Sequence, residues 1–538
     1  MARLTVPIAV RSRDGALALA AVAAERGADL VEYRVDAFAG LDSELDGLID
    51  QSPLPAILTC RSPDEGGEGD RTDEARSLLL RRLCQGSRAP AYLDMELASF
   101  QRSTVLREAV LALVDHPAQV TPTTTGLILS SHDFTGRPAD LYQRLEAMLA
   151  APAARVVKLA WRARSLRDNL EAFELLQQRG KPMIALCMGE EGLASRVLAG
   201  KFGALLTFAA LDPSHATAPG QPTLDELTGP YRFARITAAT AVFGVIGHPV
   251  GHSMSPPIHN AGFAEAGVDA VYLPMPVAPS WEAFKATVDT WLTAPGLHFR
   301  GASVTIPHKE NLLRFVRERG GEVEPLAAAI GAANTLTVRD DGSLRASNSD
   351  YAAALDSVCE ALGVPRQDLG RFRIAVIGAG GAARAIVAGF AHHGATVVVY
   401  NRTLERAQQL AEEFTAAGQG AGGKVVAARM EKLCDSCCHV FINCTPVGMH
   451  PNVDATPLPQ IASGEAGLTP GTVVFDTIYN PLQTRLLREA RAAGCLTIPG
   501  TEMFVRQAAA QFEGWTGAAA PVGLFRRVLT DRLTGSQG

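Results

Sequence analysis

Short apolar runs alternate with helical patterns through the first 211 residues of the chain. Eight such runs are present, at Thr5–Val10, Leu30–Asp36, Ala56–Arg61, Tyr92–Leu97, Gly126–His132, Arg155–Ala160, Met183–Met188 and Ala204–Ala209. The stretches between them, such as Gly15–Arg26, Asp73–Cys84 and Leu166–Gln178, have the spacing of helices. Strands that alternate with helices are typical of a parallel sheet. Eight repeats within about 210 residues predict a closed (β/α)8 barrel.

The rhythm changes after the barrel. Residues 222–241 fit a last barrel helix and a short connector, and α/β signals with Gly- and Pro-rich loops follow from about residue 242 to 350. A further strand is predicted at Phe372–Ile377 and another at Thr396–Tyr400, with a glycine-rich turn and a helix between them. We expect a barrel domain at 1–232, a linker at 233–241, a second domain at 242–350 completed by C-terminal helices at 501–538, and a nucleotide-binding domain at 351–500.

Composition narrows the class of protein. The 538 residues carry 50 basic and 56 acidic side chains, a formal charge of −6. This slight acidic excess argues against a nucleic-acid-binding protein or a polybasic membrane anchor. No apolar run approaches the roughly 20 residues of a membrane span, and the first strand begins too early to leave room for a signal peptide. We therefore expect a cytoplasmic protein that acts on small molecules.

The cysteines do not predict a disulfide framework, because nine is an odd number and sparse for this length. One cluster raises the alternative of a metal site: Cys434, Cys437, Cys438, His439 and Cys444. Only one close pair of its thiols has the spacing of metal ligands. We therefore predict reduced cysteines and no metal.

Polar residues interrupt the apolar runs of the barrel near their carboxyl ends. They are Glu32, Arg34, Asp36, Arg61, His132 and Lys158. A single residue of this kind is usually a hydrogen-bonded core group, but six at one end are hard to explain by packing. The carboxyl end of a (β/α)8 barrel is the end that carries catalytic residues.

Lys158 lies in an apolar strand, where burial would disfavour its ammonium form and leave an amine that attacks carbonyl carbons. The alternative is a strand-end lysine paired with a carboxylate. His132, on the preceding strand, favours the catalytic interpretation because an imidazole can serve as general acid and base beside a Schiff-base lysine. Glu65 could orient the imidazole. Arg34, Arg61 and Arg196 suggest an anionic, hydroxylated substrate.

The first 230 residues resemble type I 3-dehydroquinate dehydratase. The resembling pieces are Glu32–Asp36, Thr59–Arg61, Glu65–Gly67, Asp94–Glu96, Ser131–Phe134, Val157–Lys158, Ser195–Arg196 and Ala218–Gln221. The resemblance implies that Lys158 forms an imine with the substrate ketone, that His132 moves the C2 proton, and that Glu65 supports His132. It further implies that Arg196 and Gln221 hold the carboxylate and its neighbours, that Glu32, Arg34 and Arg61 contact ring hydroxyls and the loop, and that 216–221 forms a lid. Thr217 stands where the family commonly has serine, which preserves a hydroxyl.

The glycine-rich turn at Gly378–Arg384 follows a predicted strand and opens a helix, the context in which such glycines receive a pyrophosphate. The next strand ends at Asn401 and Arg402, where an acidic residue would favour NAD. Cations at this position suit a 2′-phosphate, so we predict NADP, with NAD as the alternative. The predicted cofactor residues are Gly378, Gly380, Gly381, Ala382, Asn401, Arg402, Thr403, Arg406, Thr445 and Met449.

Lys309 and Asp350 lie within a set of motifs that favours a functional role for both residues. These are Gly247–Pro256, Gly301–Lys309, Gly331–Thr335, Ser347–Asp350, Asn443–Gly448 and Asp476–Pro481. With them, residues 242–538 resemble shikimate dehydrogenase. The resemblance implies that Lys309 and Asp350 are the acid/base pair for the C3 oxygen. It also implies that substrate contacts come from Ser253, Ser255, Thr305, Asn334, Tyr479 and Gln507.

Three positions depart from that family's pattern: Ser303 for asparagine, Ser349 for threonine, and Ala353 for a frequent glycine. They bear on how the substrate is positioned rather than on the chemistry. Quinate dehydrogenases must fit one more hydroxyl, and the intact Ser255 and Thr305 favour shikimate.

The expected fold class is thus α/β, a TIM barrel followed by a two-domain unit of the shikimate dehydrogenase kind with a Rossmann NADP-binding domain. Both resemblances meet on 3-dehydroshikimate, which predicts a bifunctional enzyme of the shikimate pathway with small-molecule substrates. Three alternatives stay open: a dehydratase fused to a quinate/shikimate dehydrogenase using NAD, a Schiff-base lyase of the class I aldolase type fused to a polyol dehydrogenase, and a binding protein on inactive folds. A binding protein would be expected to lose Lys158, His132, Lys309 and Asp350, which are all present.

Overall fold

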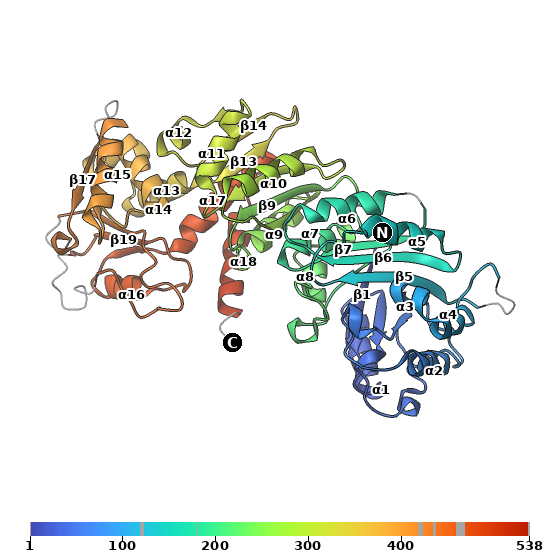
Figure 1. Ribbon diagram of the computed structural model, residues 1–538. Helices are drawn as coiled ribbons and strands as arrows, with labels where there is room; N and C mark the ends of the chain where they lie inside the picture. Colours follow the sequence, from blue (N-terminus) through green and yellow to red (C-terminus); the bar gives the residue numbers. More distant parts are fainter. Residues whose placement is uncertain are drawn as a thin grey trace.

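A computed structural model describes residues 2–118, 123–178, 180–417, 423–433, 437–458 and 468–535. Figure 1 shows three α/β units, with the barrel at one side, a second sheet in the middle and a third sheet at the other side. No helix in the described part of the chain combines the length and the apolar character needed to cross a membrane.

The first sheet is a parallel barrel of eight strands in the order β7-β6-β5-β4-β3-β2-β1-β8. Its strands are β1 (Arg3–Ala9), β2 (Leu30–Arg34), β3 (Ala56–Thr59), β4 (Tyr92–Glu96), β5 (Gly126–Asp133), β6 (Ala154–Arg162), β7 (Met183–Met188) and β8 (Leu206–Phe208). A backbone hydrogen bond from Leu205 N–H to Met183 C=O spans the seam between β8 and β7. Every residue of β7 is buried, as expected for a strand covered on both faces. The predicted barrel is confirmed.

Helices surround the barrel. They are α1 (Arg13–Glu25), α2 (Asp73–Leu83), α3 (Leu97–Arg102), α4 (Thr104–Leu111), α5 (Leu141–Ala150), α6 (Asp168–Gln177), α7 (Leu193–Val197) and α8 (Leu224–Thr228). Hydroxyl side chains begin several of them: Ser12 accepts from Gly15 N–H at α1, and Thr72 accepts from Ala75 N–H at α2. The last barrel helix, α8, has only five residues and begins with a capping box.

The middle unit has a mixed sheet in the order β10-β9-β11-β13-β14-β12. Its strands are β9 (Ala241–Gly247), β10 (Ala270–Pro276), β11 (Phe299–Val304), β12 (Glu322–Val323), β13 (Thr335–Val338) and β14 (Leu344–Ser347). Its helices are α9 (Ser255–Glu265), α10 (Trp281–Thr293), α11 (Lys309–Glu318) and α12 (Pro325–Ile330), and the C-terminal α17 (Gly500–Thr516) and α18 (Val522–Gly535) return to pack on α9. β13 runs antiparallel to both β11 and β14.

The third unit has a parallel sheet in the order β17-β16-β15-β18-β19-β20. Its strands are β15 (Arg373–Ile377), β16 (Thr396–Tyr400), β17 (Lys424–Ala428), β18 (Val440–Asn443), β19 (Val473–Asp476) and β20 (Leu496–Ile498). Its helices are α13 (Ser349–Leu362), α14 (Gly381–His392), α15 (Leu404–Ala417) and α16 (Arg485–Ala492). The strand order reverses between β15 and β18, so the loops after these two strands flank the crevice where doubly wound sheets bind ligands. The expected Rossmann fold is confirmed.

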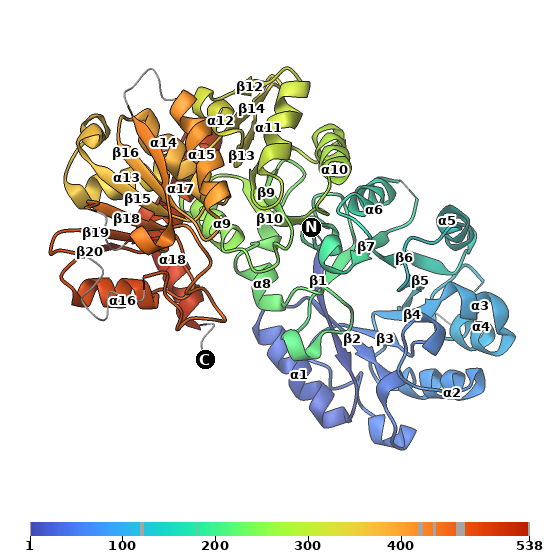
Figure 2. The ribbon, with the colours of Figure 1, turned by 60° about the vertical axis from the view of Figure 1, so that its left-hand side comes forward.

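Lys201 joins the barrel to the middle unit, which lie next to each other in Figure 2. Its ammonium donates hydrogen bonds to the carbonyls of Ala238 (2.7 Å) and Thr240 (2.8 Å), in the segment between the last barrel element and β9. A barrel lysine thereby holds the backbone of the connector in a defined position.

The cysteine cluster gives no metal site among the described residues, where no group of three or more histidine, cysteine or acidic side chains could hold an ion. The Nδ1 of His439 instead accepts a hydrogen bond from the backbone N–H of Arg373. Cys434 lies outside the described residues.

Candidate active sites

One cavity at the carboxyl ends of the barrel strands brings together all the side chains predicted for the first site. It is lined by Glu32, Arg34, Arg61, Glu65, His132, Lys158, Arg196, Thr217 and Gln221, with Phe134, Ala160, Leu186, Met188, Phe208 and Ala218. The strand register explains why two of them converge. Lys158 on β6 pairs with Ser130 on β5, so His132, two residues further along β5, points to the same face.

Glu65 holds His132 through one oxygen. Its Oε2 accepts a hydrogen bond from the His132 backbone N–H (2.8 Å) and lies 3.0 Å from His132 Nδ1. Glu65 closes a 3-10 turn, Pro63–Glu65, which ends at Gly66 with φ of +84°, a conformation that favours glycine. Burial raises the pKa of the Glu65 carboxyl to about 7. Burial, together with the Arg61 and Lys158 cations, holds the pKa of His132 well below its usual value.

Lys158 does not lie in the apolar surroundings that its strand suggested. Its Nζ donates to Asp94 Oδ2 (3.1 Å) and lies 3.6 Å from Glu32 Oε1. The carboxylates come from β4 and β2 across the barrel interior. Lys158 is buried, as its strand predicted, but it lies against carboxylates as well as apolar groups, and its role as the nucleophile stays a prediction. Lys158 therefore pairs with carboxylates and also lines the cavity predicted to be catalytic.

Arg196 is a deeply buried cation. Its side chain lines the cavity and is 1% exposed, and its Nε has no hydrogen bond among the described residues. None of the carboxylates in the described chain forms an ion pair with it. Burial lowers the pKa of this guanidinium to about 10, so it stays charged at neutral pH. An uncompensated buried cation is costly, and an anionic ligand would satisfy it.

Arg34 and Arg61, predicted to contact substrate, are already occupied by carboxylates. Arg34 makes two hydrogen bonds of 2.9 Å with Asp36. Arg61 lies 2.8 Å from Asp94 and 3.2 Å from Glu96, and donates to the Ser130 hydroxyl. Both guanidinium groups line the cavity, and both hold acidic side chains in place through these contacts.

Three residues of the predicted lid line this cavity, namely Thr217, Ala218 and Gln221. Gln221 Oε1 accepts a hydrogen bond from the Thr217 backbone N–H (3.0 Å) and lies 3.3 Å from the Thr217 hydroxyl. The cavity beneath measures about 50 Å³, room for one or two water molecules. A six-membered ring with its substituents would occupy more space than this, so we expect the predicted lid to move when substrate binds.

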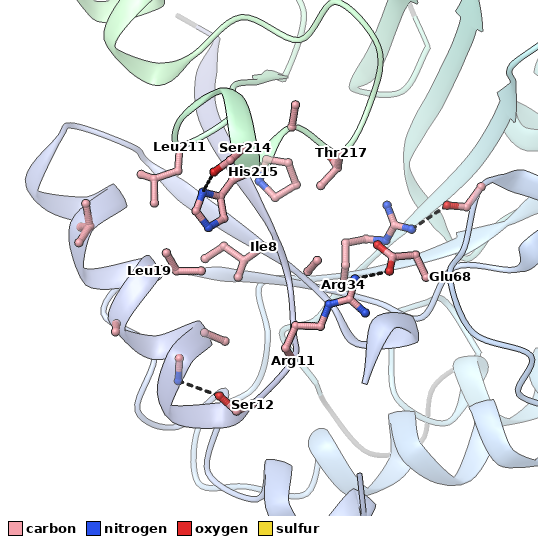
Figure 3. A pocket seen from close by; sticks show the side chains of 18 residues that line it. Ile8, Arg11, Ser12, Leu19, Arg34, Glu68, Leu211, Ser214, His215 and Thr217 are labelled. Carbon is pink, nitrogen blue, oxygen red and sulfur yellow. Dashed lines mark hydrogen bonds and ion pairs between the residues drawn. The ribbon is translucent and has the colours of Figure 1, made fainter. Parts of the chain in front are cut away.

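A larger hollow of about 660 Å³ adjoins the site but is not lined by the predicted catalytic residues (Figure 3). Ile8 and Leu19 face the loop that carries His215, and Arg34 and Thr217 belong to both hollows. Neither Lys158 nor His132 lines it, so we regard it as the outer approach to the lid.

The second site is a cavity of about 310 Å³ lined mostly by the middle unit, with Asp350 and Tyr479 contributed by the third unit. Every predicted catalytic and substrate-contacting residue of this half lines it: Ser253, Ser255, Thr305, Lys309, Asn334, Asp350, Tyr479 and Gln507. Residues more than 200 positions apart in sequence thus meet, because α17 returns from the end of the chain to cover β11 and β13.

Lys309 and Asp350 are in contact, with 2.6 Å between Nζ and Oδ2. Lys309 begins α11 after a tight turn, and Asp350 lies in the first turn of α13, which the Asn348 side chain caps. A carboxylate near a helix N-terminus is stabilised by the helix dipole. The pair is therefore held on two rigid helices and is suited to pass a proton.

Ser303, one of the departures from the family pattern, is part of a buried hydrogen-bond chain. It accepts from the Tyr272 hydroxyl and donates to Gln511 Oε1, at 2.7 Å each. Asn334 is similarly held, since its Oδ1 accepts from the Ser349 backbone N–H (2.8 Å). These amide and hydroxyl groups shape one wall of the cavity.

The turn after β15 fits the pyrophosphate of a dinucleotide. Gly378 has φ of +111°, and a Cβ there would lie 3.1 Å from the Cys444 carbonyl oxygen. Gly380 and Gly381, at the start of α14, face open space instead. The backbone N–H groups of α14 are thus accessible to an anion at the switch point of the sheet.

The groups predicted around the ribose and nicotinamide lie at the same edge. Asn401 follows β16 and donates to the Thr403 carbonyl, while Arg402 and Arg406 are exposed and form no ion pair among the described residues. Thr445 donates to Asn443 Oδ1 (2.7 Å) in the loop after β18, and Met449 is exposed.

Three residues that the motif analysis assigned no role complete these sites. Asp94 contacts Lys158, Phe208 lines the first cavity, and Asp476 accepts from Asn443 (3.0 Å) to hold the loop after β18. Burial raises the pKa of Asp476 to about 6. Asp94 and Asp476 do lie in motifs that carry the resemblances, which is the signal that could have found them.

Comparison with known proteins agrees with the two sites. Residues 4–238 match the family described as type I 3-dehydroquinase. Residues 245–336 match the shikimate dehydrogenase substrate binding domain, residues 364–431 match shikimate/quinate 5-dehydrogenase, and residues 500–530 match the shikimate 5′-dehydrogenase C-terminal domain.

The chain is 37% identical over 544 residues to a chloroplastic bifunctional 3-dehydroquinate dehydratase/shikimate dehydrogenase of Arabidopsis thaliana, which covers 98% of this chain and 84% of the relative. It is 40% identical over 296 residues to shikimate dehydrogenase (NADP(+)) of Methanosarcina acetivorans, covering 54% of this chain and 98% of that protein. A crystal structure of shikimate 5-dehydrogenase from Listeria monocytogenes with shikimate and NAD is 32% identical, covers 55% of this chain and 98% of that chain, and has a TM-score of 0.49. Two complete sites on one chain, with similarity that spans nearly all of it, place this protein in the family of bifunctional 3-dehydroquinate dehydratase/shikimate dehydrogenases.

Proposed function

We propose that the chain converts 3-dehydroquinate to 3-dehydroshikimate and water in the barrel, and reduces 3-dehydroshikimate to shikimate with NADPH in the second site. The observation that carries the first activity is the buried Arg196 guanidinium, which pairs with no carboxylate among the described residues and lines the same cavity as Lys158 and His132. A carboxylate on Arg196 would place the ring of a cyclic acid between the amine and the imidazole.

In the dehydration, the Lys158 ammonium passes a proton to the C3 carbonyl oxygen as its amine attacks C3, and loss of that oxygen as water leaves an iminium, which makes the C2 proton acidic. Ionised Glu65 accepts a hydrogen bond from Nδ1–H of His132, which leaves Nε2 free to take that proton. His132 then returns the proton to the C1 hydroxyl, which leaves as water. Addition of a water molecule to the product iminium releases 3-dehydroshikimate and restores the Lys158 ammonium. Arg196 holds the carboxylate throughout, and the Thr217–Gln221 lid excludes solvent.

When bound, NADPH would supply the hydride that adds to C3 of the substrate. The Lys309–Asp350 pair delivers a proton to the C3 oxygen, which becomes the hydroxyl of shikimate. Ser253, Ser255 and Tyr479 bind the carboxylate from one side of the cavity. The ring hydroxyls meet Thr305, Asn334, Asp350 and Gln507.

NADP binds at the switch point of the third sheet. The start of α14 receives the pyrophosphate at Gly380, Gly381 and Ala382. Arg402 and Arg406, which form no ion pair among the described residues, would bind the 2′-phosphate next to Asn401 and Thr403. The Thr445–Met449 loop lies on the nicotinamide side.

The test uses the purified full chain with 3-dehydroquinate and NADPH, followed by the absorbance of the reduced nicotinamide. We expect the purified chain alone to oxidise NADPH, with no other dehydratase or dehydrogenase added. Supplying 3-dehydroshikimate directly isolates the second reaction. Replacing NADPH with NADH tests the NAD alternative. Running the reverse reaction with quinate tests the quinate alternative. If NADPH stays reduced even with an added dehydratase, the dehydrogenase assignment is wrong. The cytoplasmic location expected from the sequence stays a prediction, since the Arabidopsis relative is chloroplastic.

A further inference from the structure

The nitrogen of Lys158 faces a carboxylate to which the dehydration above gives no task. Asp94, on β4, is 1% exposed. Its Oδ2 accepts from Lys158 Nζ at 3.1 Å, while its Oδ1 accepts from the Ser130 hydroxyl at 2.6 Å and lies 2.8 Å from Arg61. Both oxygens are therefore fixed by donors, and the carboxylate has one defined position against the reacting nitrogen.

Other groups around this nitrogen also favour a positive charge. The ring centroid of Phe208 lies 4.4 Å from Lys158 Nζ, within the range of a cation–π contact. Glu32 Oε1 lies 3.6 Å from the same nitrogen and is oriented by the Thr59 hydroxyl at 2.8 Å. Burial alone would raise the pKa of Asp94, but the Arg61 and Lys158 cations hold it below its usual range, so Asp94 stays ionised.

The charges in this part of the barrel balance. Six linked side chains, each at most 4% exposed, form one cluster: the cations Arg61, Arg76 and Lys158 and the carboxylates Glu32, Asp94 and Glu96. Three positive and three negative groups sum to zero only while the Lys158 nitrogen is charged. A buried site strongly disfavours an uncompensated charge.

Imine formation preserves that balance. The ammonium and the ketone give an iminium and water: the carbon–nitrogen bond forms, the carbonyl oxygen departs, and two ammonium protons leave with it as water. The nitrogen carries one positive charge before and after. When His132 takes the C2 proton, the C–H electron pair forms a carbon–carbon double bond, the nitrogen becomes a neutral enamine, and the charge resides on the imidazole. Loss of the C1 hydroxyl with that proton restores the iminium.

We propose that Asp94 is the counter-ion of the iminium on Lys158, stabilising the charged nitrogen on both sides of the proton transfer. This inference rests on the proposed dehydratase activity. It adds Asp94 to the catalytic residues Lys158, His132 and Glu65. It also explains the Arg61 and Ser130 contacts, which orient the Asp94 carboxylate toward the nitrogen.

The test is Asp94→Asn, which keeps the side-chain shape and removes the charge. Borohydride is added with 3-dehydroquinate, and the adduct on the Lys158 peptide is followed by mass spectrometry over time. We expect the rate of adduct formation and the dehydratase kcat to fall together, on the order of 100-fold. The reduction of 3-dehydroshikimate by the same sample reports that the rest of the chain is folded and is expected to be unchanged.

Glu96→Gln is the matched control, because it removes a carboxylate of the same cluster that does not contact Lys158. We expect the folded variant to slow adduct formation by less than about tenfold, because the lost charge lies further from the reacting nitrogen than that of Asp94. Ser130→Ala, which removes one donor to Asp94, is a milder variant and is expected to slow it several-fold. Adduct formation at the parent rate in Asp94→Asn, or an equal loss in Glu96→Gln, would overturn the counter-ion role. If Asp94→Asn does not fold, a parent rate in Ser130→Ala overturns it instead. A parent protein that forms no adduct at all would instead refute the dehydratase itself.

Discussion

A single carboxylate oxygen of Glu65 holds both the backbone N–H and the ring Nδ1 of His132, at 2.8 Å and 3.0 Å. The histidine ring therefore has a fixed orientation, and its tautomer depends on whether Glu65 is ionised. Ionised Glu65 accepts Nδ1–H and leaves Nε2 as the base. Protonated Glu65 would donate to Nδ1 and place the ring proton on Nε2, where the base is needed.

This coupling predicts an acid limb in the dehydratase reaction. Because burial raises the pKa of Glu65 to about 7, kcat/KM should rise with pH through about 7 as Glu65 loses its proton. The pKa of His132 lies well below its usual value, so the imidazole is neutral over this range and does not produce the limb. The measurement is kcat/KM for 3-dehydroquinate against pH.

Glu65→Gln keeps an acceptor but cannot titrate. It should flatten the limb and lower kcat by about 10 to 100-fold. The shikimate dehydrogenase pH profile of the same sample serves as the control, since its catalytic pair lies in a different unit. A limb near pH 7 that persists in Glu65→Gln would contradict the assignment.

Lys158→Arg should abolish dehydration while retaining the positive charge of the buried cluster. A guanidinium keeps the ion pair with Asp94 but cannot form an imine, so we expect kcat to fall at least on the order of 1,000-fold. Reduction of 3-dehydroshikimate should stay within about twofold of the parent. Residual dehydration above a tenth of the parent value would show that the lysine amine is not the nucleophile.

Asp350→Asn should produce the opposite pattern. Removing the carboxylate 2.6 Å from Lys309 Nζ takes away one half of the proton-transfer pair, and we expect the dehydrogenase kcat to fall by about 100-fold or more. Dehydratase activity, measured on the same preparation, should not change. An unaltered dehydrogenase kcat would remove Asp350 from the mechanism.

Arg402→Gln tests the predicted preference for NADP. Loss of a cation that pairs with a 2′-phosphate should raise the KM for NADPH roughly tenfold and leave the KM for NADH nearly unchanged. Arg406→Gln, four residues further and within α15, is the companion variant and should have the smaller effect. Equal changes for both coenzymes would rule out a contact to the 2′-phosphate.

Ser303→Ala should lower the free energy of unfolding by about 1 to 3 kcal/mol, because it leaves the Tyr272 hydroxyl and the Gln511 amide oxygen without their shared partner in a buried site. Ser357→Ala is the matched control: Ser357 is also buried, but its hydroxyl donates only to a helix carbonyl, that of Ala353. Chemical denaturation measures both variants, and equal losses would show that the chain through Ser303 contributes nothing special.

The sequence predicted most of the fold because the relevant signals are local. The apolar run at Met183–Met188 coincides with β7 at both ends, and the run at Thr396–Tyr400 coincides with β16. A run of β-branched and aliphatic residues followed by a helical pattern needs no distant partner to be recognised. The short α8 was less predictable, since its polar surroundings carry little periodicity.

The surroundings of the site residues were beyond local patterns. The apolar neighbours of Lys158 in its own strand suggested a dry pocket, whereas Asp94 and Glu32 reach it from other strands across the barrel. Ser303 and Gln511 are 208 positions apart, and only the return of the C-terminal helix unites them. Contacts of this kind depend on strand register and tertiary packing, which no window of sequence contains.

The balanced cluster around Lys158 also constrains how this barrel can change. Loss of any one of its six charged side chains leaves a buried charge without compensation, a change that typically destabilises a protein by about 3 to 5 kcal/mol. Loss of one cation together with one carboxylate does not. Substitutions in this region should therefore be tolerated in opposite-sign pairs, and a redesign of the barrel for another ketone can keep the cluster intact while altering Arg196 and the lid.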